Sequence, residues 1–259
     1  MSCCPPGSWD GPLDQSGAGP SQAGTLLKIG DATPAYHTGI SGEGTSGGGT
    51  KTGIVVFPDV WGMLDRTKLI CDTLASQGHE VVLFDPFRGE TKADHPDDTA
   101  LAWLKSVPYE PNVAKDVEAC VAFLLSKGVD QTRIGALGFC WGAWAISKAT
   151  CSGFDFKCSV WAHPSTGIER RVFNRDEDAM IRGVRMPVLV MCAGNDDERL
   201  KNGGELAHLI QLRGGRSHDF PDMIHGFATR CDTSIPENRR DAEKALTLAS
   251  TFFAEHLPS

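Results

Sequence analysis

The sequence predicts an α/β protein whose central sheet is mainly parallel and covered by helices on both faces. Two observations favour this class. Between residues 53 and 257, short apolar runs of the buried-strand type alternate with longer segments of helical periodicity. Unbroken apolar runs are typical of strands buried on both faces, and strand–helix alternation is typical of parallel sheets. No internal linker is visible, so we expect a single domain over residues 24–259 after a flexible N-terminal segment at 1–23.

The expected elements follow one another in a regular order. Strands are predicted where short apolar runs are bounded by turn residues, at residues 25–29, 35–38, 53–57, 80–84, 133–138, 158–162, 187–192 and 217–220. Helices are predicted where apolar residues recur at helical spacing, at residues 65–76, 112–127, 142–149 and 237–256. The glycine-rich stretch 39–53 lacks the Gly-Lys-Ser/Thr ending of a phosphate loop, so we interpret it as a surface loop.

Charge and composition exclude several classes of function. The chain has 259 residues and a formal net charge of −8, whereas non-specific binding to nucleic acid or to anionic membranes requires a basic surface. No apolar stretch is long enough to span a bilayer, and the N-terminus lacks the basic and apolar regions of a secretory signal. We therefore expect a cytoplasmic protein, a monomer or weak homodimer, that binds neither nucleic acid nor membrane.

The cysteines indicate free thiols. There are nine of them, an odd number, and their spacing forms no disulfide framework. No Cys-x-x-Cys pair occurs, and no histidine cluster has metal-ligand spacing, so we expect no metal site. Cys3 and Cys4 lie in the Gly-, Ser- and Pro-rich start of the chain, and we interpret the pair as part of an exposed tail.

The strongest chemical signal is Gly138-Phe139-Cys140-Trp141-Gly142, between a predicted strand and a predicted helix. Gly-x-Cys-x-Gly in this context is the nucleophile-elbow pattern of the α/β-hydrolase fold, with Cys in place of Ser. The sharp turn lifts the nucleophile above the sheet and brings the flanking residues together, so both flanks are glycine. The helix N-terminus favours a thiolate and leaves the N–H of Trp141 for an oxyanion. A cysteine packed in the core is the alternative.

Two further residues complete the chain order of nucleophile, acid and base that this fold uses. Asp196 follows a predicted strand in a Gly-Asn-Asp turn, and His225 comes after the last predicted strand. We predict that His225 moves the proton of Cys140 and that Asp196 orients the imidazole and stabilises its charged form. Asp197 and His218 are the weaker candidates for the acid and the base.

A fourth motif, Phe-Pro-Asp-Val-Trp-Gly-Met, begins at Phe57 directly after a predicted buried strand. In this fold the loop at that position supplies the second oxyanion N–H. We therefore predict an oxyanion hole formed by the backbone N–H groups of Val60 and Trp141. Trp61 and His163 are candidate walls of the pocket.

Taken together, these motifs resemble those of the dienelactone hydrolase family, from about residue 53 to the C-terminus. The resemblance rests on PDVWG at 58–62, GFCWG at 138–142, AGND at 193–196 and HGF at 225–227. The family implies an α/β-hydrolase fold without a large cap domain and a Cys-His-Asp triad that uses no metal or organic cofactor. It also implies hydrolysis of small lactones or esters through a thioacyl intermediate.

The resemblance implies roles for three charged residues as well. Asp59 stands where the founding members carry a Glu that contacts the resting thiol, so this shorter side chain is a candidate modulator of Cys140. Those members hold the carboxylate of their substrate with arginines. Arg230, five residues after His225, and Arg88 are the candidate anchors, since arginine suits two-pronged recognition of a carboxylate.

The sequence thus predicts a cysteine-dependent hydrolase whose partner is a small ester or lactone. Two alternatives remain open. The same residues could serve a thioesterase or a glycan-directed hydrolase. The fold could also be a non-catalytic binding or redox-sensing module in which Cys140 is the sensor, although a sensor thiol needs no ordered acid–base pair.

Overall fold

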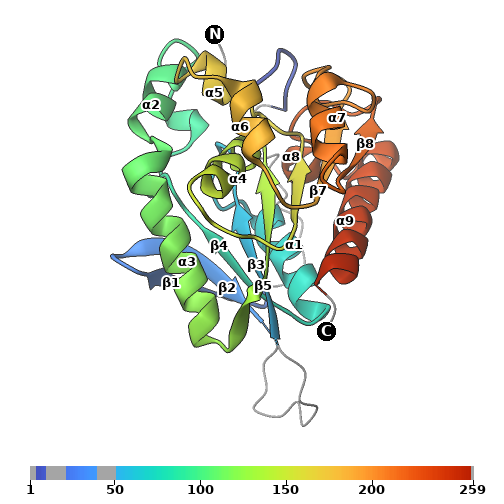
Figure 1. The fold of residues 1–259 in the computed structure, drawn as a ribbon. Helices are drawn as coiled ribbons and strands as arrows, with labels where there is room; N and C mark the ends of the chain where they lie inside the picture. The colour runs from blue at the N-terminus through green and yellow to red at the C-terminus, as the bar shows by residue number, and fades with distance from the viewer. Residues whose placement is uncertain (1–3, 10–21, 40–50, 258–259) are drawn as a thin grey trace.

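The computed structural model describes residues 4–9, 22–39 and 51–257. The surface loop expected at 39–53 and the flexible segment expected at 1–23 fall largely outside these residues. At the centre lies an eight-stranded sheet in the order β1-β2-β4-β3-β5-β6-β7-β8 (Figure 1). Its strands are β1 (Thr25–Ile29), β2 (Thr33–Thr38), β3 (Lys51–Phe57), β4 (His79–Phe84), β5 (Val129–Phe139), β6 (Ser159–Ala162), β7 (Val188–Ala193) and β8 (Arg216–Phe220).

The sheet is mainly parallel, as expected. β3 pairs in parallel with β4 and β5, and the parallel pairing continues from β5 through β6 and β7 to β8. Only the edge formed by β1 and β2 is antiparallel, where β2 pairs with β4 and β1 pairs with β2. Parallel strands end at the same edge of a sheet, so the loops after β3, β5, β6, β7 and β8 lie near one another.

Helices cover both faces of the sheet. The α-helices are α1 (Asp65–Ser76), α2 (Ala100–Ser106), α3 (Ala114–Ser126), α4 (Trp141–Cys151), α5 (Ile168–Arg171), α6 (Glu177–Gly183), α7 (Glu205–Gln211), α8 (Phe227–Arg230) and α9 (Pro236–His256). A short 3₁₀ turn at Lys92–Asp94 and a π turn at Tyr109–Val113 flank α2. None of the helices in the described part of the chain has the length and apolarity needed to cross a membrane.

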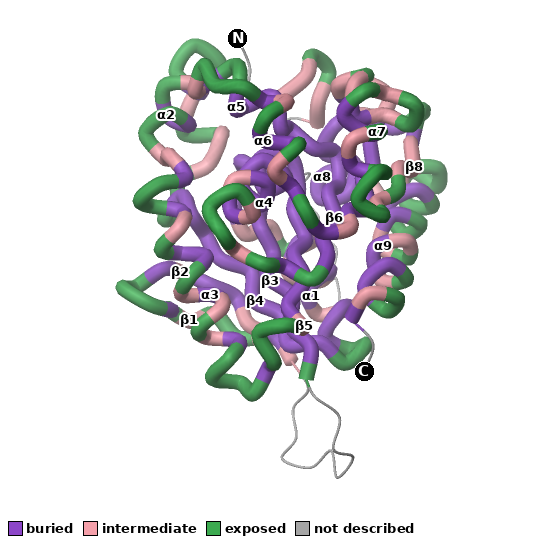
Figure 2. Tube along the Cα trace, viewed as in Figure 1, coloured by how far each residue is buried: buried purple, intermediate pink, exposed green. Residues whose placement is uncertain are grey.

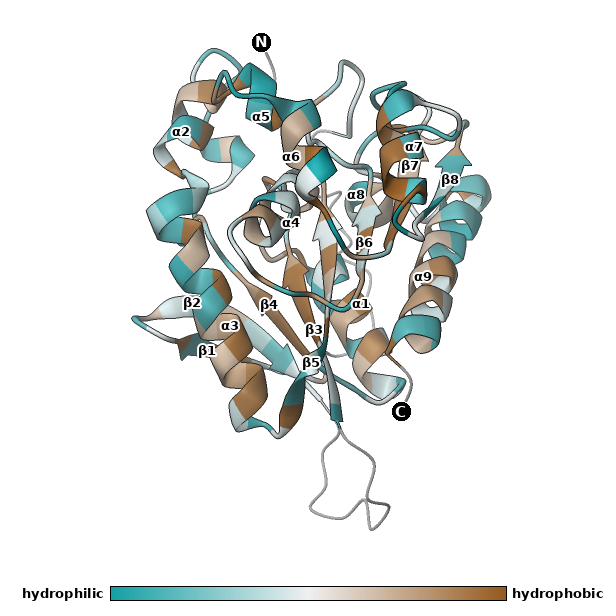
Figure 3. Ribbon diagram, viewed as in Figure 1, coloured by the Kyte–Doolittle hydropathy of each residue, from teal (hydrophilic) through white to brown (hydrophobic). Residues whose placement is uncertain are grey.

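Two apolar cores lie on opposite faces of the sheet because side chains alternate along each strand. In β3, Val55 and Phe57 pack into the core beneath α3, α4, α6 and α7, whereas Ile54 and Val56 pack against α1 and α9. The central strands are accordingly buried and hydrophobic, while the outer helix surfaces are exposed and polar (Figures 2 and 3).

The fold prediction is confirmed, with differences in detail. Every predicted strand and helix is present within a few residues, but β5 begins at Val129 rather than at 133. Five helices, α2 and α5 to α8, were not predicted. Each has seven residues or fewer, and two turns of helix are too short to establish a hydrophobic period against neighbouring loops.

Candidate active site

Cys140 occupies the one-residue turn between β5 and α4. Its backbone has φ 52° and ψ −110°, outside the conformations that a non-glycine residue ordinarily adopts. A Cβ at Gly138 would lie 2.7 Å from the backbone carbon of Gly142, and a Cβ at Gly142 would collide with the carbonyl of Phe57. The structure therefore shows the physical reason for both glycines of the motif.

Backbone hydrogen bonds tie this turn to the neighbouring strand. The N–H of Cys140 donates to the carbonyl of Ala162 at 3.1 Å, and the carbonyl of Cys140 accepts from the N–H of Ser165 at 3.0 Å. The Ser165 hydroxyl lies 3.3 Å from the Cys140 sulfur. The strained turn is thus held by β6 and the loop after it, which fixes the sulfur relative to the sheet edge.

His225 lies in the loop after β8, and residues of the turn after β7 bind it. Nδ1 of His225 lies 2.5 Å from Oδ1 of Asp196, and both side chains are buried. Asp196 also accepts from the N–H of Ala193 at 2.7 Å, and the Asn195 side chain accepts from the backbone N–H of His225 at 2.6 Å. These contacts fix both the position and the tautomer of the imidazole, with Nε2 turned away from the carboxylate.

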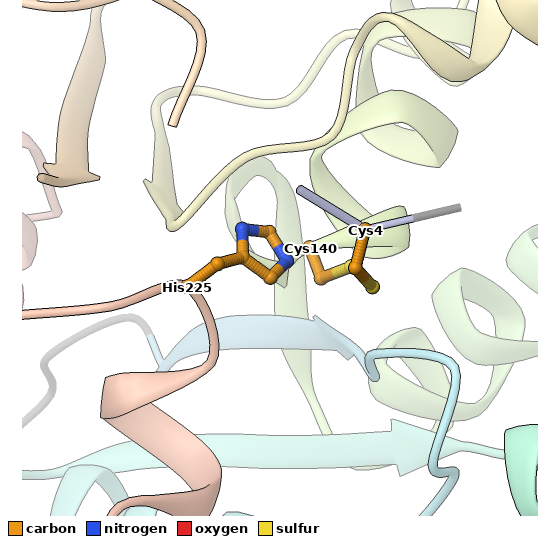
Figure 4. A group of neighbouring side chains, drawn as sticks. All are labelled: Cys4, Cys140 and His225. Atoms are coloured by element: carbon orange, nitrogen blue, oxygen red, sulfur yellow. The ribbon is translucent and has the colours of Figure 1, made fainter. Parts of the chain in front are cut away.

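His225 and Cys140 lie together at the sheet edge, as the chain order predicts. A ring nitrogen of His225 lies within 4.8 Å of the Cys140 sulfur, and the ring edge faces that sulfur (Figure 4). Nε2 is buried and makes no hydrogen bond within the described residues. The runner-up acid is bound elsewhere: the carboxylate of Asp197 contacts the guanidinium of Arg199 at 3.4 Å.

The electrostatics favour a thiolate beside a charged imidazole. Burial raises the pKa of Cys140, but its contact with Cys4 and the charges of His225 and Arg230 outweigh burial and hold that pKa well below the usual range. Burial lowers the pKa of His225, whereas the charges of Cys140 and Asp196 raise it to about 10. A thiolate is the nucleophilic form of cysteine, so this arrangement suits attack on an acyl carbon.

The two predicted oxyanion donors belong to buried residues of the same core. Val60 and Trp141 have no exposed surface, and both pack into the cluster that includes Cys140. The loop of Val60 is closed by a hydrogen bond from the N–H of Gly62 to the carbonyl of Asp59 at 3.1 Å. The roles of these N–H groups remain predictions.

Asp59 makes its contacts with a neighbouring arginine and not with the thiol. Its carboxylate forms a buried ion pair with Arg230 and accepts from the Thr229 hydroxyl and the Trp61 N–H, each at 2.8 Å. Burial outweighs the charge of Arg230, and together with the charge of Cys140 it raises the pKa of Asp59 above its ordinary value. Any influence of Asp59 on Cys140 would therefore pass through the electric field and through Arg230.

The two candidate anchors lie in different settings. Arg230 is buried with its guanidinium carbon 6.0 Å from the centre of the Trp61 ring, and one terminal nitrogen has no hydrogen-bond partner among the described residues. Arg88 is half exposed, binds Asp116 with two hydrogen bonds of 2.7 and 3.0 Å, and makes no described contact with Cys140 or His225. The structure brings Arg230 to the candidate site and leaves Arg88 apart from it.

The structure adds an N-terminal segment that sequence reasoning missed. The Cys4 sulfur lies 3.7 Å from the Cys140 sulfur. The N–H of Trp9 donates to the carbonyl of His225, and the Asn195 amide donates to the carbonyl of Pro6, each at 3.0 Å. No sequence signal could place this tail, since it has no hydrophobic period and its contacts lie more than a hundred residues away.

His163 shapes the other side of the candidate base. It follows β6 with φ 39°, and its ring meets the His225 ring edge-on at a centroid distance of 5.0 Å. Burial, then the charges of His225 and Arg230, lower the pKa of His163 well below its usual value. A neutral imidazole is therefore expected here, and the role of His163 as a pocket wall remains a prediction.

Comparisons with known proteins agree with this architecture. A model of the dienelactone hydrolase family matches residues 43–257. An uncharacterised AIM2 family protein of Schizosaccharomyces pombe is 30% identical over 215 residues, 77% of this chain and 81% of that protein. The human carboxymethylenebutenolidase homolog is 23% identical over 206 residues, 73% of this chain and 78% of that protein.

Solved structures show the same fold. A dienelactone hydrolase-like promiscuous phosphotriesterase from metagenomic libraries has a TM-score of 0.67 at 18% identity, covering 90% of this chain and 99% of that chain. A protein from Klebsiella pneumoniae described as a dienelactone hydrolase has a TM-score of 0.66 at 16% identity, covering 86% of this chain and 98% of that chain. With the family model spanning most of its length and an α/β-hydrolase fold, the chain belongs to the dienelactone hydrolase family.

Proposed function

We propose that this hydrolase cleaves small carboxylic esters or lactones with Cys140 as the nucleophile. The observation that carries the proposal is the arrangement of Cys140 on its strained turn beside His225, whose Nδ1 lies 2.5 Å from the Asp196 carboxylate. A buried cysteine used only for packing needs neither a base beside it nor a carboxylate that orients that base.

The reaction would run in two halves. The Cys140 thiolate attacks the acyl carbon, and the N–H groups of Val60 and Trp141 bind the oxyanion. His225 gives its proton to the departing alkoxide, which leaves a thioacyl enzyme. His225 then takes a proton from water as that water attacks the thioester, and the carboxylic acid departs while the thiolate is restored.

The surroundings favour a small substrate that carries a negative charge. Arg230 offers a terminal nitrogen that no described residue binds, and the aromatic faces of Trp61 and Trp141 belong to the same region. A carboxylate on the substrate would bind this nitrogen through a charge-assisted hydrogen bond. Arg230 is therefore the proposed anchor in preference to Arg88, whose guanidinium already binds Asp116.

Hydrolysis of p-nitrophenyl acetate tests the proposal. Cys140→Ala should lower kcat at least about 10³-fold, and His225→Ala about 10²- to 10⁴-fold. Cys151→Ala is the matched control, because this exposed thiol donates a hydrogen bond to the Met180 carbonyl, away from the candidate site, and it should retain full turnover. Full turnover by Cys140→Ala would show that the nucleophile is assigned wrongly.

A substrate panel separates the alternatives that use the same residues. Lactones, aryl esters with and without a carboxylate, acyl thioesters and acetylated sugars should be compared by kcat/KM. We expect anionic esters and lactones to lead. During turnover of a slow ester, intact-mass measurement should detect an acyl group on the wild-type chain and none on Cys140→Ala.

A further inference from the structure

Three potential metal ligands from distant parts of the chain meet at the candidate nucleophile. Cys4 comes from the N-terminal segment, Cys140 from the turn after β5, and His225 from the loop after β8 (Figure 4). The two sulfurs are 3.7 Å apart, and a ring nitrogen of His225 lies within 4.8 Å of both. The proposed hydrolysis takes place at Cys140 and His225, whereas Cys4 forms and breaks no bond in it.

The sulfur separation matches a tetrahedral zinc site. Two thiolates bound to Zn²⁺ at about 2.3 Å each lie about 3.8 Å apart in tetrahedral geometry. The observed separation of 3.7 Å means that both sulfurs could bind one ion without moving. A histidine nitrogen bound at about 2.0 to 2.1 Å would lie about 3.6 Å from each sulfur, so the ring needs to approach by about an ångström at most.

The orientation of His225 suits it to bind a metal ion. Its Nδ1 is held by the Asp196 carboxylate at 2.5 Å, which turns Nε2 toward the two sulfurs, where loss of its proton would expose a lone pair to an ion. Nε2 is buried and has no hydrogen-bond partner among the described residues. A carboxylate behind a coordinating histidine is the usual arrangement around zinc, because it fixes the tautomer and strengthens the ligand.

Contacts independent of any ion hold Cys4 in place. The carbonyl of Trp9 accepts from Nε of Arg230 at 3.0 Å, and the carbonyl of Pro6 accepts from the Asn195 amide at 3.0 Å. The positive charge of Arg230, which would oppose a cation nearby, is balanced by its buried ion pair with Asp59. The segment 4–9 therefore presents a second thiol to a site that is already assembled.

We propose that Cys4, Cys140 and His225 form an inhibitory site for a thiophilic divalent cation such as Zn²⁺. The ion binds Cys140 as its thiolate and displaces any proton on the Cys4 thiol together with the Nε2 proton of His225; these protons pass to solvent, no oxidation state changes, and water completes the coordination. The ion occupies the nucleophile and the base together and ties residues 4–9 across them. Cation binding stands on geometry alone, whereas inhibition rests on the proposed function.

Cobalt provides a readout that does not depend on activity. The full-length chain, reduced and freed of metal, is titrated with Co²⁺ while absorption is recorded. Tetrahedral coordination with thiolates should give intense visible bands and near-ultraviolet sulfur-to-cobalt charge transfer. Cys4→Ser and Cys140→Ser should weaken cobalt binding at least about tenfold, while Cys151→Ser, which alters an exposed thiol, should match the wild type.

Cys3 is adjacent to Cys4 in the sequence, so one more variant is needed to show that the Cys3 thiol is not the ligand. Cys3→Ser should leave the cobalt spectrum intact, and the double variant Cys3→Ser/Cys4→Ser should lose the charge-transfer band. A spectrum that is lost with Cys3→Ser or Cys151→Ser, or that survives the double variant, would overturn the assignment.

Inhibition is measured separately with p-nitrophenyl acetate and Zn²⁺. Each variant is compared with its own metal-free rate, and the zinc concentration for half inhibition should rise at least about tenfold in Cys4→Ser. EDTA should restore the wild-type rate. Inhibition that is reversed by a thiol reductant and not by EDTA would overturn the cation site in favour of a Cys4–Cys140 disulfide. Cobalt bands in a chain without esterase activity would uphold the site and reject the proposed function.

Discussion

Cys140 and Cys192 are two buried thiols of one sheet with opposite chemistry. Cys192 lies near the carboxyl end of β7, and Cys140 directly follows β5, with β6 between the two strands. Burial, followed by the charges of Asp196 and Asp219, raises the pKa of Cys192 well above the ordinary value. The pKa of Cys140 is held well below it despite complete burial.

The difference shows that backbone position, and not burial, separates a reactive thiol from an inert one. Cys192 is part of an extended strand, where it pairs in register with Asp219 and meets negative charge. Cys140 sits at the N-terminus of α4, where the helix dipole favours an anion and where His225 supplies a positive charge. The turn after β5 thus places Cys140 at an electropositive edge of the sheet and not inside an apolar strand.

Asp196 acts on both thiols: besides burial, its charge raises the pKa of Cys192, and it orients the His225 imidazole beside Cys140. Its removal should therefore give the largest effect. Asp196→Asn should lower kcat about 10³- to 10⁴-fold, because the imidazole loses its orientation and its stabilising charge. Asp197→Asn is the matched control, since this neighbouring carboxylate contacts Arg199 at the surface. Steady-state hydrolysis of p-nitrophenyl acetate measures both. Equal losses in the two variants would mean that Asp196 is not the acid.

The second prediction concerns the pH dependence of Cys140. Contact with Cys4 and the charge of His225 lower the pKa of Cys140 against the effect of burial, so the thiolate should persist as pH falls until the lowered pKa is crossed. In His225→Ala the pKa should rise toward the value of an ordinary cysteine, about 8.5. Alkylation of Cys140 by iodoacetamide at pH 6 should then slow at least about tenfold, while Cys192 stays unlabelled in both forms.

Mass spectrometry of the cysteine-containing peptides resolves the two thiols in that experiment. Brief labelling in urea serves as the control, because unfolding should make Cys192 react. If the alkylation midpoint of Cys140 stays in place in His225→Ala, the ion-pair account of its reactivity fails.

Sequence patterns singled out Cys140, Asp196 and His225, which the structure brings together, because each residue follows the carboxyl end of a strand. Such positions can be read locally: an apolar run ends, and a reactive residue follows it in a turn. The parallel sheet then brings Cys140, Asp196 and His225 to one edge, whatever the length of the chain between them. The sharp turn also explains why Gly138 and Gly142 could be interpreted in steric terms.

Features that depend on contacts without a local period could not be predicted. Cys4 reaches Cys140 through a segment with no periodicity, and the sequence indicated an exposed tail instead. Arg88 follows β4 and Arg230 ends α8, and their local sequences do not show that both pair with buried carboxylates while one guanidinium is half exposed and the other is buried. Burial and pairing of charges are properties of the assembled fold.

The third prediction compares the two arginines. Arg230→Lys keeps a positive charge beside Asp59 but removes the terminal nitrogen that is proposed to bind the substrate carboxylate, so KM for an anionic aryl ester should rise about 10- to 100-fold. Arg88→Lys should leave KM within about twofold. The ratio of KM values for anionic and neutral esters isolates carboxylate binding from general damage. An unchanged ratio in Arg230→Lys would remove Arg230 as the anchor.

The smallest expected effect belongs to Cys192. Cys192→Ala should leave kcat unchanged and lower the free energy of unfolding by about 1 to 2 kcal/mol, because a buried sulfur is lost and a small cavity remains. Urea unfolding followed by fluorescence measures the difference, with Cys151→Ala at the surface expected within about 0.5 kcal/mol of the wild type. A large loss of kcat in Cys192→Ala would show that reactivity at this edge does not reside in the elbow alone, because packing from β7 would then be needed to hold Asp196 in place.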